Sequence, residues 1–280
     1  MPNLTGIAWA DLTSNPWTGC KKKSEACVHC YAETVAERFK GKAFPNGFEL
    51  TFKWHELDAI KKMRTYGKTI FVCSMSDFFL DDHEFDLPIG TMDAARDRCL
   101  EMYCSDYAQS VQGLRIMLLT KRAEVMTRYF SAREIPQNIM LGVTVESPRH
   151  YNRIESLQSL NPVQRFLSIE PLLAPMPGIP LAGIDLAIVG GESGSHLHDP
   201  AIAGKRALVE KVRGGWKPRA DRIDWVRDIH AQCLQADARF FFKQWGGANS
   251  GSAGHELDDR IYQPAPPKLN KSCPNHVPTP

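Results

Sequence analysis

Short apolar runs recur along the chain, separated by stretches in which apolar residues follow helical spacing. The runs are rich in Ile, Val, Leu and Phe with little polar–apolar alternation, which is typical of strands covered on both faces. They predict strands at 6–10, 69–73, 114–119, 139–145, 165–169, 185–189 and 239–242. The intervening stretches predict helices at 31–39, 91–111, 121–129, 148–157 and 223–236. This alternation predicts an α/β fold with a parallel sheet, either wound open or rolled into a full or partial barrel.

Polar residues follow six of the predicted strands in succession, and four of these strand ends carry a carboxylate. In parallel α/β folds the carboxyl ends of the strands share one edge, where binding sites are built. The pattern therefore predicts a ring of ligands around a common cavity. Its members are Ser74, Ser76, Asp77, Lys121, Arg122, Thr144, Glu146, Glu170, Gly190, Gly191, Glu192, Lys243, Gln244 and Trp245.

Length and composition are those of a soluble globular protein: 280 residues, of which 43% are hydrophobic and 24% charged. No apolar run reaches the roughly 20 residues that a bilayer-spanning helix needs. The first residues also lack the pattern of a signal peptide, so we expect a cytoplasmic protein that does not bind membranes. The formal net charge of +2 is too small to indicate or exclude a nucleic-acid partner.

The composition divides the chain into an α/β unit at 1–247 and a tail at 248–280 rich in Gly, Ser and Pro, for which we expect loose packing at best. Within the α/β unit, residues 194–219 form a long basic insertion. It is interpreted either as a solvated loop or as a lid or phosphate-contacting segment.

Three of the eight cysteines, Cys20, Cys27 and Cys30, lie close together in the sequence. A cytoplasmic compartment keeps thiols reduced, which favours metal binding, catalysis or burial over disulfides. Four of the scattered cysteines are interpreted as small buried apolar residues: Cys73, Cys99, Cys104 and Cys233.

The spacing Cys20-x6-Cys27-x2-Cys30 favours an iron–sulfur cluster, because three thiolates can hold three irons of a [4Fe–4S] cube and leave the fourth iron open. A bidentate amine and carboxylate can occupy such an open position. The alternative is a structural zinc site, which needs a fourth ligand. His29 lies awkwardly between Cys27 and Cys30, and the sequence holds no second CxxC pair. It also lacks a P-loop, an HExxH pair and a GxSxG elbow, so nucleotide hydrolysis, zinc proteolysis and serine hydrolysis have no support.

With these motifs the sequence resembles a phage-associated family of three-cysteine-motif proteins, which are divergent members of the radical SAM superfamily. The matching stretches include NPWTGC at 15–20, CVHCYAE at 27–33 and FVCSMSDFF at 71–79, and others lie at 119–122, 141–146, 168–173, 189–194 and 241–246. The first cysteine gap is three residues longer than in the commonest radical SAM motif. The basic insertion also departs from the family pattern and leaves the substrate open.

The resemblance implies a six-stranded partial (β/α) TIM-like barrel with an extra C-terminal strand and a cluster loop at 15–31. S-adenosylmethionine (SAM) would chelate the open iron, and its reductive cleavage would yield a 5′-deoxyadenosyl radical that abstracts a hydrogen atom from the substrate. An electron donor of flavodoxin or ferredoxin type would be needed. The SAM amine would lie at Ser74, Ser76 and Asp77, and the ribose hydroxyls at Thr144, Glu146 and Glu170. The backbone at Gly190, Gly191 and Glu192 would approach SAM closely, and Tyr31 would lie beside the adenine.

Substrate contacts are expected at the same edge. Lys121, Arg122, Lys243 and Gln244 suit a carboxylate or a phosphate. Trp17 and Trp245 suit stacking on a nucleobase, with core packing as the alternative.

The leading hypothesis is therefore a radical SAM enzyme acting on a nucleobase or nucleotide, for example an amino-acid-modified thymine in phage DNA hypermodification, with an isomerase-type rearrangement. A phage-encoded protein would act in the host cytoplasm. Two alternatives stay open. One is a non-enzymatic nucleic-acid-binding protein stabilised by zinc or an iron–sulfur cluster, and the other is a radical SAM enzyme for a peptide or small metabolite.

Overall fold

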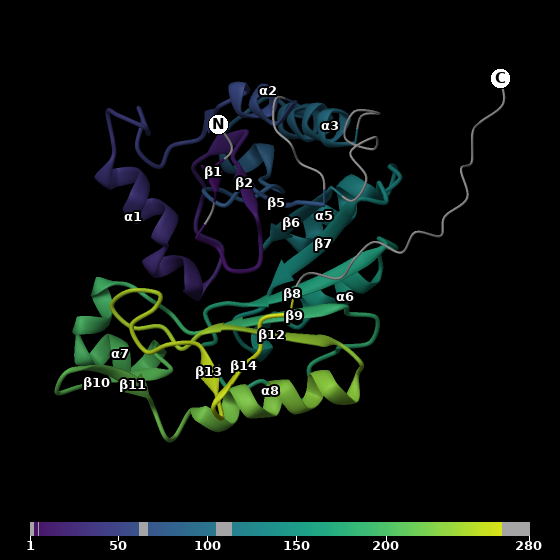
Figure 1. Cartoon of the computed structure of the whole chain (residues 1–280). Helices are drawn as coiled ribbons and strands as arrows, with labels where there is room; N and C mark the ends of the chain where they lie inside the picture. The colour runs from purple at the N-terminus through teal and green to yellow at the C-terminus, as the bar shows by residue number, and fades with distance from the viewer. Residues whose placement is uncertain (1–2, 5, 62–66, 105–113, 265–280) are drawn as a thin grey trace.

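The computed structural model describes residues 3–4, 6–61, 67–104 and 114–264. It is built around one eight-stranded sheet with the order β1-β2-β5-β6-β7-β8-β9-β12 (Figure 1). Only β1 is antiparallel to its neighbour, and the other seven strands are parallel. The strands are β1 (Asn3–Leu4), β2 (Leu12–Ser14), β5 (Thr69–Val72), β6 (Arg115–Thr120), β7 (Ile139–Thr144), β8 (Gln164–Ile169), β9 (Leu186–Gly190) and β12 (Arg239–Gln244).

The sheet curls into a half barrel, which confirms the predicted partial TIM-like barrel with an extra C-terminal strand. Within the described residues no hydrogen-bonded pairing joins its two edge strands, β1 and β12. One side of the barrel therefore stays open, and the carboxyl ends of the seven parallel strands share one edge.

Alternate residues of the strands pack into two separate apolar clusters, one on each face of the sheet. The larger cluster takes in the buried residues of helices α3 (Thr91–Tyr103), α5 (Ala123–Phe130), α6 (Asn152–Gln158) and α8 (Ile223–Gln235). The smaller cluster lines what we call the inner face and contains Trp9, Phe71, Met117, Met140, Phe166, Leu186, Ile188 and Phe241.

The predicted first strand at 6–10 is wrong, because these residues form a bend and a turn. The ring of Trp9 packs 4.6 Å from that of Phe71 and 6.3 Å from that of Phe166. The apolar run therefore fills the inner face instead of joining the sheet. β2 is the first parallel strand, and its Leu12 pairs with Ile70 of β5.

The predicted helices are present, with small shifts in their ends. Helix α1 (Tyr31–Arg38) follows the 3-10 turn η1 (Glu25–His29), and α6 follows η3 (Pro148–His150). The helix predicted at 91–111 ends at Tyr103, and residues 105–113 lie outside the described part. The prediction missed β3 (Trp17–Thr18), β4 (Thr51–Phe52), α2 (His55–Lys61) and η2 (Asp82–Glu84).

The basic insertion at 194–219 is folded. It contains η4 (Ser195–His198), α7 (Pro200–Arg206) and a hairpin of β10 (Val209–Val212) and β11 (Gly215–Pro218). Figure 1 shows α7 and this hairpin on the same side of the molecule as α1.

Residues 248–264 pack more closely than the sequence led us to expect. They form β13 (Glu256–Leu257) and β14 (Arg260–Ile261), and Leu257 is buried. The backbone N–H of Phe242 donates to Tyr262 at 2.7 Å, which ties the segment to β12. Residues 265–280 of the predicted tail lie outside the described residues. None of the helices in the described ranges combines the length and the apolar character required to cross a membrane.

Candidate active site at the carboxyl edge of the half barrel

The loop that carries the three cysteines, residues 15–31, lies across the carboxyl edge of the sheet; we call it the cysteine loop. The backbone N–H of Gly19 donates to the carbonyl of Met75, after β5, at 3.1 Å. Further along, the carbonyl of Lys21 accepts from Arg122, after β6, at 2.9 Å. Ser24 then donates to Glu146, after β7, at 2.5 Å. The loop thus contacts three neighbouring strand ends in turn.

Asp77, after β5, is saturated by donors from the protein itself. Its buried carboxylate accepts from Thr120 Oγ1 at 2.6 Å, from the backbone N–H of Lys121 at 3.0 Å and from Arg122 Nη1 at 3.2 Å. Arg122 is buried too and also donates through Nε to both oxygens of Glu84, at 2.9 and 2.7 Å. The pKa of the Arg122 guanidinium is raised, because Asp77 and Glu84 outweigh the effect of burial.

The thiols of the loop lie in a partly buried environment that raises the pKa of two of them. Burial raises the pKa of Cys20 to about 12, helped by Asp77 and opposed by Arg122, whose Nη1 lies 3.7 Å from the sulfur. Burial also raises the pKa of Cys30, and the Cys27 thiol adds to the shift of both Cys20 and Cys30. All three are free and only partly buried. The donor set therefore suits a cluster with one open iron.

Within the described ranges, no group of three or more His, Cys, Asp or Glu side chains is already arranged to hold a metal ion. The assignment of Cys20, Cys27 and Cys30 as ligands stays a prediction.

Glu146 is fully buried at the end of β7 and joins the cysteine loop to Arg153 of α6. Besides the hydroxyl of Ser24 it accepts from Arg153 Nη1 at 2.8 Å, and Lys121 Nζ lies 3.6 Å away. The Lys121 ammonium also lowers the pKa of Cys30, although burial dominates that pKa. Thr144, two residues before Glu146, is buried and accepts from Arg153 through its carbonyl.

Glu170 and Lys243 form a partly exposed charged pair at this edge. Their side chains are 14% and 28% exposed, and the carboxylate lies 3.0 Å from the ammonium. Both adjoin Gly190 on the inner face: a Cβ there would lie 2.9 Å from Glu170 Oε1 and 3.5 Å from Lys243 Cβ. Glycine therefore leaves room for this pair beside the backbone of β9.

The glycine and glutamine that flank this pair serve chain packing. A Cβ on Gly191 would lie 1.9 Å from the carbonyl oxygen of Trp245, so the close backbone approach predicted for Gly191 is to β12. Gln244 Nε2 donates to the carbonyl of Gly191 and to Ser193, both at 3.4 Å. Glu192 is buried against Arg206 and His196 of the insertion.

Tyr31 and the turn after β5 hold the start of α1. The Tyr31 hydroxyl donates to the carbonyl of Ser74, while Asn15 Oδ1 accepts from the Met75 backbone at 2.9 Å and from the Ser74 hydroxyl at 3.3 Å. Ser76 donates to the carbonyl of Gly19 at 2.5 Å.

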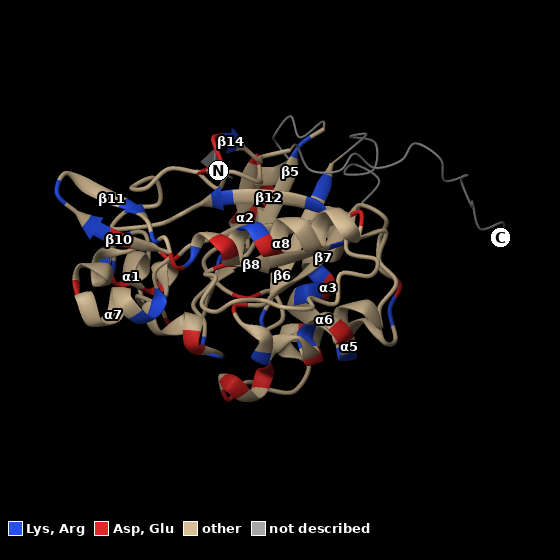
Figure 2. Cartoon of the chain, turned by 90° about the horizontal axis from the view of Figure 1, so that it is seen from below, with Lys and Arg blue, Asp and Glu red and all other residues tan. Residues whose placement is uncertain are grey.

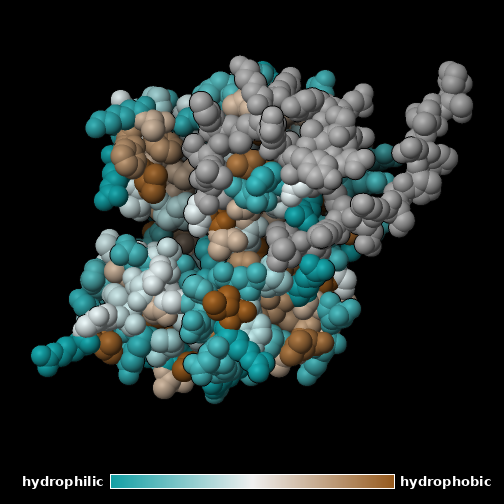
Figure 3. Space-filling view, viewed as in Figure 1, coloured by the Kyte–Doolittle hydropathy of each residue, from teal (hydrophilic) through white to brown (hydrophobic). Residues whose placement is uncertain are grey.

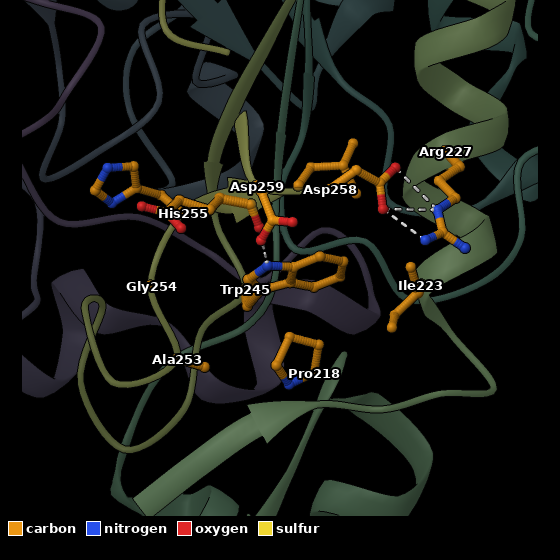
Figure 4. A pocket seen from close by; sticks show the side chains of 11 residues that line it. Pro218, Ile223, Arg227, Trp245, Ala253, Gly254, His255, Asp258 and Asp259 are labelled. Carbon is orange, nitrogen blue, oxygen red and sulfur yellow. Dashed lines mark hydrogen bonds and ion pairs between the residues drawn. The ribbon is translucent and has the colours of Figure 1, made fainter. Parts of the chain in front are cut away.

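Neither predicted stacking tryptophan offers a free ring face to the edge. Trp17 is fully buried, with its ring stacked 5.2 Å from that of Phe78. Trp245 is 3% exposed and lines a pocket of about 470 Å³ against the C-terminal segment (Figure 4). Both belong to the larger core, away from the inner face.

Several residues that hold the loop or its partners were not predicted from the sequence: Ser24, Glu25, Glu84, His150 and Arg153. The Glu25 carboxylate accepts from Ser147 at 3.1 Å and pairs with His150 at 2.9 Å. Burial opposes ionisation of Glu25, but the hydrogen bond from His150 lowers its pKa to about 2. No local pattern marks these residues, because their partners lie up to 125 positions away.

A family model described as "Protein of unknown function (DUF5131)" matches residues 4–266. The chain belongs to this family. No curated protein matches the chain.

Among solved structures, variants of spore photoproduct lyase share the fold. A tyrosine-to-phenylalanine variant is 12% identical with a TM-score of 0.51, over 89% of this chain and 78% of that one. A double variant, described with bound AdoMet and dinucleoside spore photoproduct, is 13% identical with a TM-score of 0.50 over the same shares. The chain thus shares the half-barrel fold of these structures.

Proposed function

We propose that this protein is a radical SAM enzyme in which Cys20, Cys27 and Cys30 hold a [4Fe–4S] cluster. One observation carries the proposal. A loop with three free thiols, in which Cys27 lies near enough to raise the pKa of Cys20 and of Cys30, lies across the carboxyl edge of a parallel half barrel. This edge is where α/β barrels place their chemistry.

The three cysteines would hold the cluster, which together with SAM and one electron from a flavodoxin- or ferredoxin-type donor would supply the radical chemistry that removes a hydrogen atom from the substrate. The chain supplies placement and exclusion of water. Phe166, Met117 and Ile188 line the inner face with apolar surface below the strand ends.

For SAM we propose contacts among the residues predicted from the sequence, and we compare them by the partners that each side chain already has within the protein. The turn of Ser74 and Ser76 receives the amine, Thr144, Glu146 and Glu170 the ribose, and Gly190 the backbone approach, with Tyr31 beside the adenine. Asp77, Gly191 and Glu192 already have partners within the protein. Of the four strand-end carboxylates, Glu170 has the most exposed side chain, at 14%, and its partner Lys243 is 28% exposed. Glu170 is therefore the best placed to exchange its partner for a ligand.

A nucleobase or nucleotide is the substrate class that we favour. The insertion hairpin carries the exposed residues Lys211, Arg213 and Lys217 (Figure 2). Within the described residues, neither Lys211 nor Arg213 pairs with a carboxylate, so both charges are available to phosphates. One of the similar structures is described with bound AdoMet and dinucleoside spore photoproduct. A modified thymine in phage DNA, and rearrangement of its adduct in the host cytoplasm, is our specific form of this proposal.

The electron donor would dock beside the cysteine loop. Tyr31 and Phe39, at the two ends of α1, are 55% and 43% exposed. Apolar side chains gather over α1 and the loop that follows it (Figure 3). Exposed apolar patches mark protein contacts. Phe39→Ser should weaken turnover driven by a protein donor and leave turnover driven by dithionite unchanged.

Anaerobic reconstitution tests the central proposal. The wild-type chain should take up about four irons and four sulfides and release 5′-deoxyadenosine with dithionite and SAM. Cys20→Ala, Cys27→Ala and Cys30→Ala should each abolish both, whereas Cys104→Ala, a partly buried thiol outside the loop, should retain them. A colourless protein holding one tightly bound zinc would refute the enzyme. Stimulation of SAM cleavage by DNA, and not by peptides, would support the substrate class.

A further inference from the structure

Arg206, the last residue of α7, connects the insertion to the cysteine loop. Its Nε and Nη2 atoms donate to the two oxygens of Glu192 at 2.6 and 2.8 Å, and its Nη1 donates to the carbonyl of Glu25 at 3.1 Å. The Arg206 side chain is 15% exposed and that of Glu192 is 5% exposed. Such a charged pair is shielded from solvent and binds more strongly than a surface pair.

A second contact joins the same two segments. The rings of His29, in η1, and His196, in η4, are stacked with centroids 4.0 Å apart and an angle of 4° between their planes. The Glu25 carboxylate, at the start of η1, is held by Ser147 and His150 after β7. The turn that carries Cys27 is therefore gripped between the end of β7 and the insertion that follows β9.

We infer that the insertion is a clamp on the cysteine loop and that Arg206 is its positioning residue. It joins the cysteine loop to the segment that follows β9 at the carboxyl edge of the half barrel. Cys27 and Cys30 follow Glu25 by two and five positions, so the clamp fixes the half of the loop that carries them. Cys20 lies outside its reach and is held by Arg122 instead.

The chemistry of the guanidinium explains why an arginine occupies this position. Its planar fork offers donors in fixed directions, so one side chain can bind both carboxylate oxygens and a carbonyl at once. A lysine would keep the charge pair with Glu192 but could not hold all three acceptors. Arg206→Lys therefore removes hydrogen bonds of the clamp while the net charge of the site stays the same.

The test uses the chain without a cluster, so it does not depend on the proposed enzymatic activity. Labelling of each thiol by a cysteine reagent is timed by mass spectrometry. In Arg206→Lys, Cys27 and Cys30 should label about tenfold faster, the change expected when one charge-assisted hydrogen bond is lost. Cys20 should keep its rate, as should all cysteines in the control Arg227→Lys, whose arginine pairs with Asp224 and Asp258.

Buried Cys99 and Cys233 report on the fold. If both stay protected and Cys27 and Cys30 label at the wild-type rate in Arg206→Lys, the clamp is refuted. If all cysteines of Arg206→Lys label faster, the variant has unfolded. The double variant Arg206→Gln and Glu192→Gln, which removes both buried charges, then replaces it in the same comparison of labelling rates. Failure of the wild-type chain to assemble a cluster would refute the proposed function and leave this result intact.

Discussion

The Nη1 atom of Arg122 lies 3.7 Å from the sulfur of Cys20 and so joins the cysteine loop to the end of β6. The same guanidinium pairs with Asp77 and Glu84, and the side chains of Arg122 and Asp77 are only 2% and 7% exposed. Arg122→Met would leave both carboxylates without their cation. We expect the free energy of unfolding to fall by roughly 3–5 kcal/mol, the usual cost of breaking a buried pair from one side.

Urea denaturation measures this loss. The matched control is Arg133→Met, which removes an arginine from Asp97 in a pair whose side chains are 35% and 50% exposed. That variant should lose no more than about 1 kcal/mol, as surface pairs do. Equal losses in the two variants would mean that the Arg122 network contributes no more than a surface ion pair.

Gly142 sets the spacing of the inner face. A Cβ at this position would lie 2.5 Å from the ring of Phe166, closer than real contacts allow. Gly142→Ala should therefore destabilise the chain by about 1–3 kcal/mol through overpacking. Gly204→Ala, in α7, meets nothing within 4 Å and should stabilise by about 0.5–1 kcal/mol through helix propensity. Thermal unfolding of the two variants measures both stability changes. A Gly142→Ala variant as stable as the wild type would show that the Phe166 ring can move aside.

The sheet could be predicted from sequence because its strands are buried on both faces. The apolar run at 139–145 corresponds to β7 (Ile139–Thr144), in which every residue is buried. The run at 6–10 has similar composition, but the ring of Trp9 finds its contacts on the inner face, so the segment turns instead of pairing. Local pattern alone does not distinguish these two outcomes.

The shared edge of the candidate site was also predictable, since parallel strands must end together. What each side chain does there was not. Ser24 and Glu146 lie 122 positions apart, and their contact depends on where the cysteine loop settles. Trp17 carries the same aromatic surface that a stacking residue would, and only its burial against Phe78 shows that it belongs to the core.

The insertion should loosen at acid pH through His196. Burial lowers the pKa of this imidazole, and His29 and Arg206 lower it further, against the opposing effect of Glu192. The unfolded chain therefore takes up a proton near pH 6.5 before the folded chain does, and stability is lost as the pH falls through this range. His196→Gln should lose less stability than the wild type between pH 7.5 and pH 5.5, as the midpoint of thermal unfolding would show. Parallel pH profiles for the two proteins would contradict this assignment.

The insertion hairpin should set the salt dependence of nucleic-acid binding, if the proposed substrate class is right. Each phosphate contact that is removed lowers the slope of log K against log salt by about 0.9 for duplex DNA and about 0.7 for single strands. We expect losses of this size for Lys211→Ala and for Arg213→Ala, whose side chains are exposed on the hairpin. Lys68→Ala, at the amino end of β5 on the opposite edge of the sheet, should leave the slope unchanged. Release of 5′-deoxyadenosine without DNA should stay at the wild-type rate in all three variants, so an unchanged slope in both hairpin variants would remove the hairpin as the phosphate contact without touching the radical chemistry.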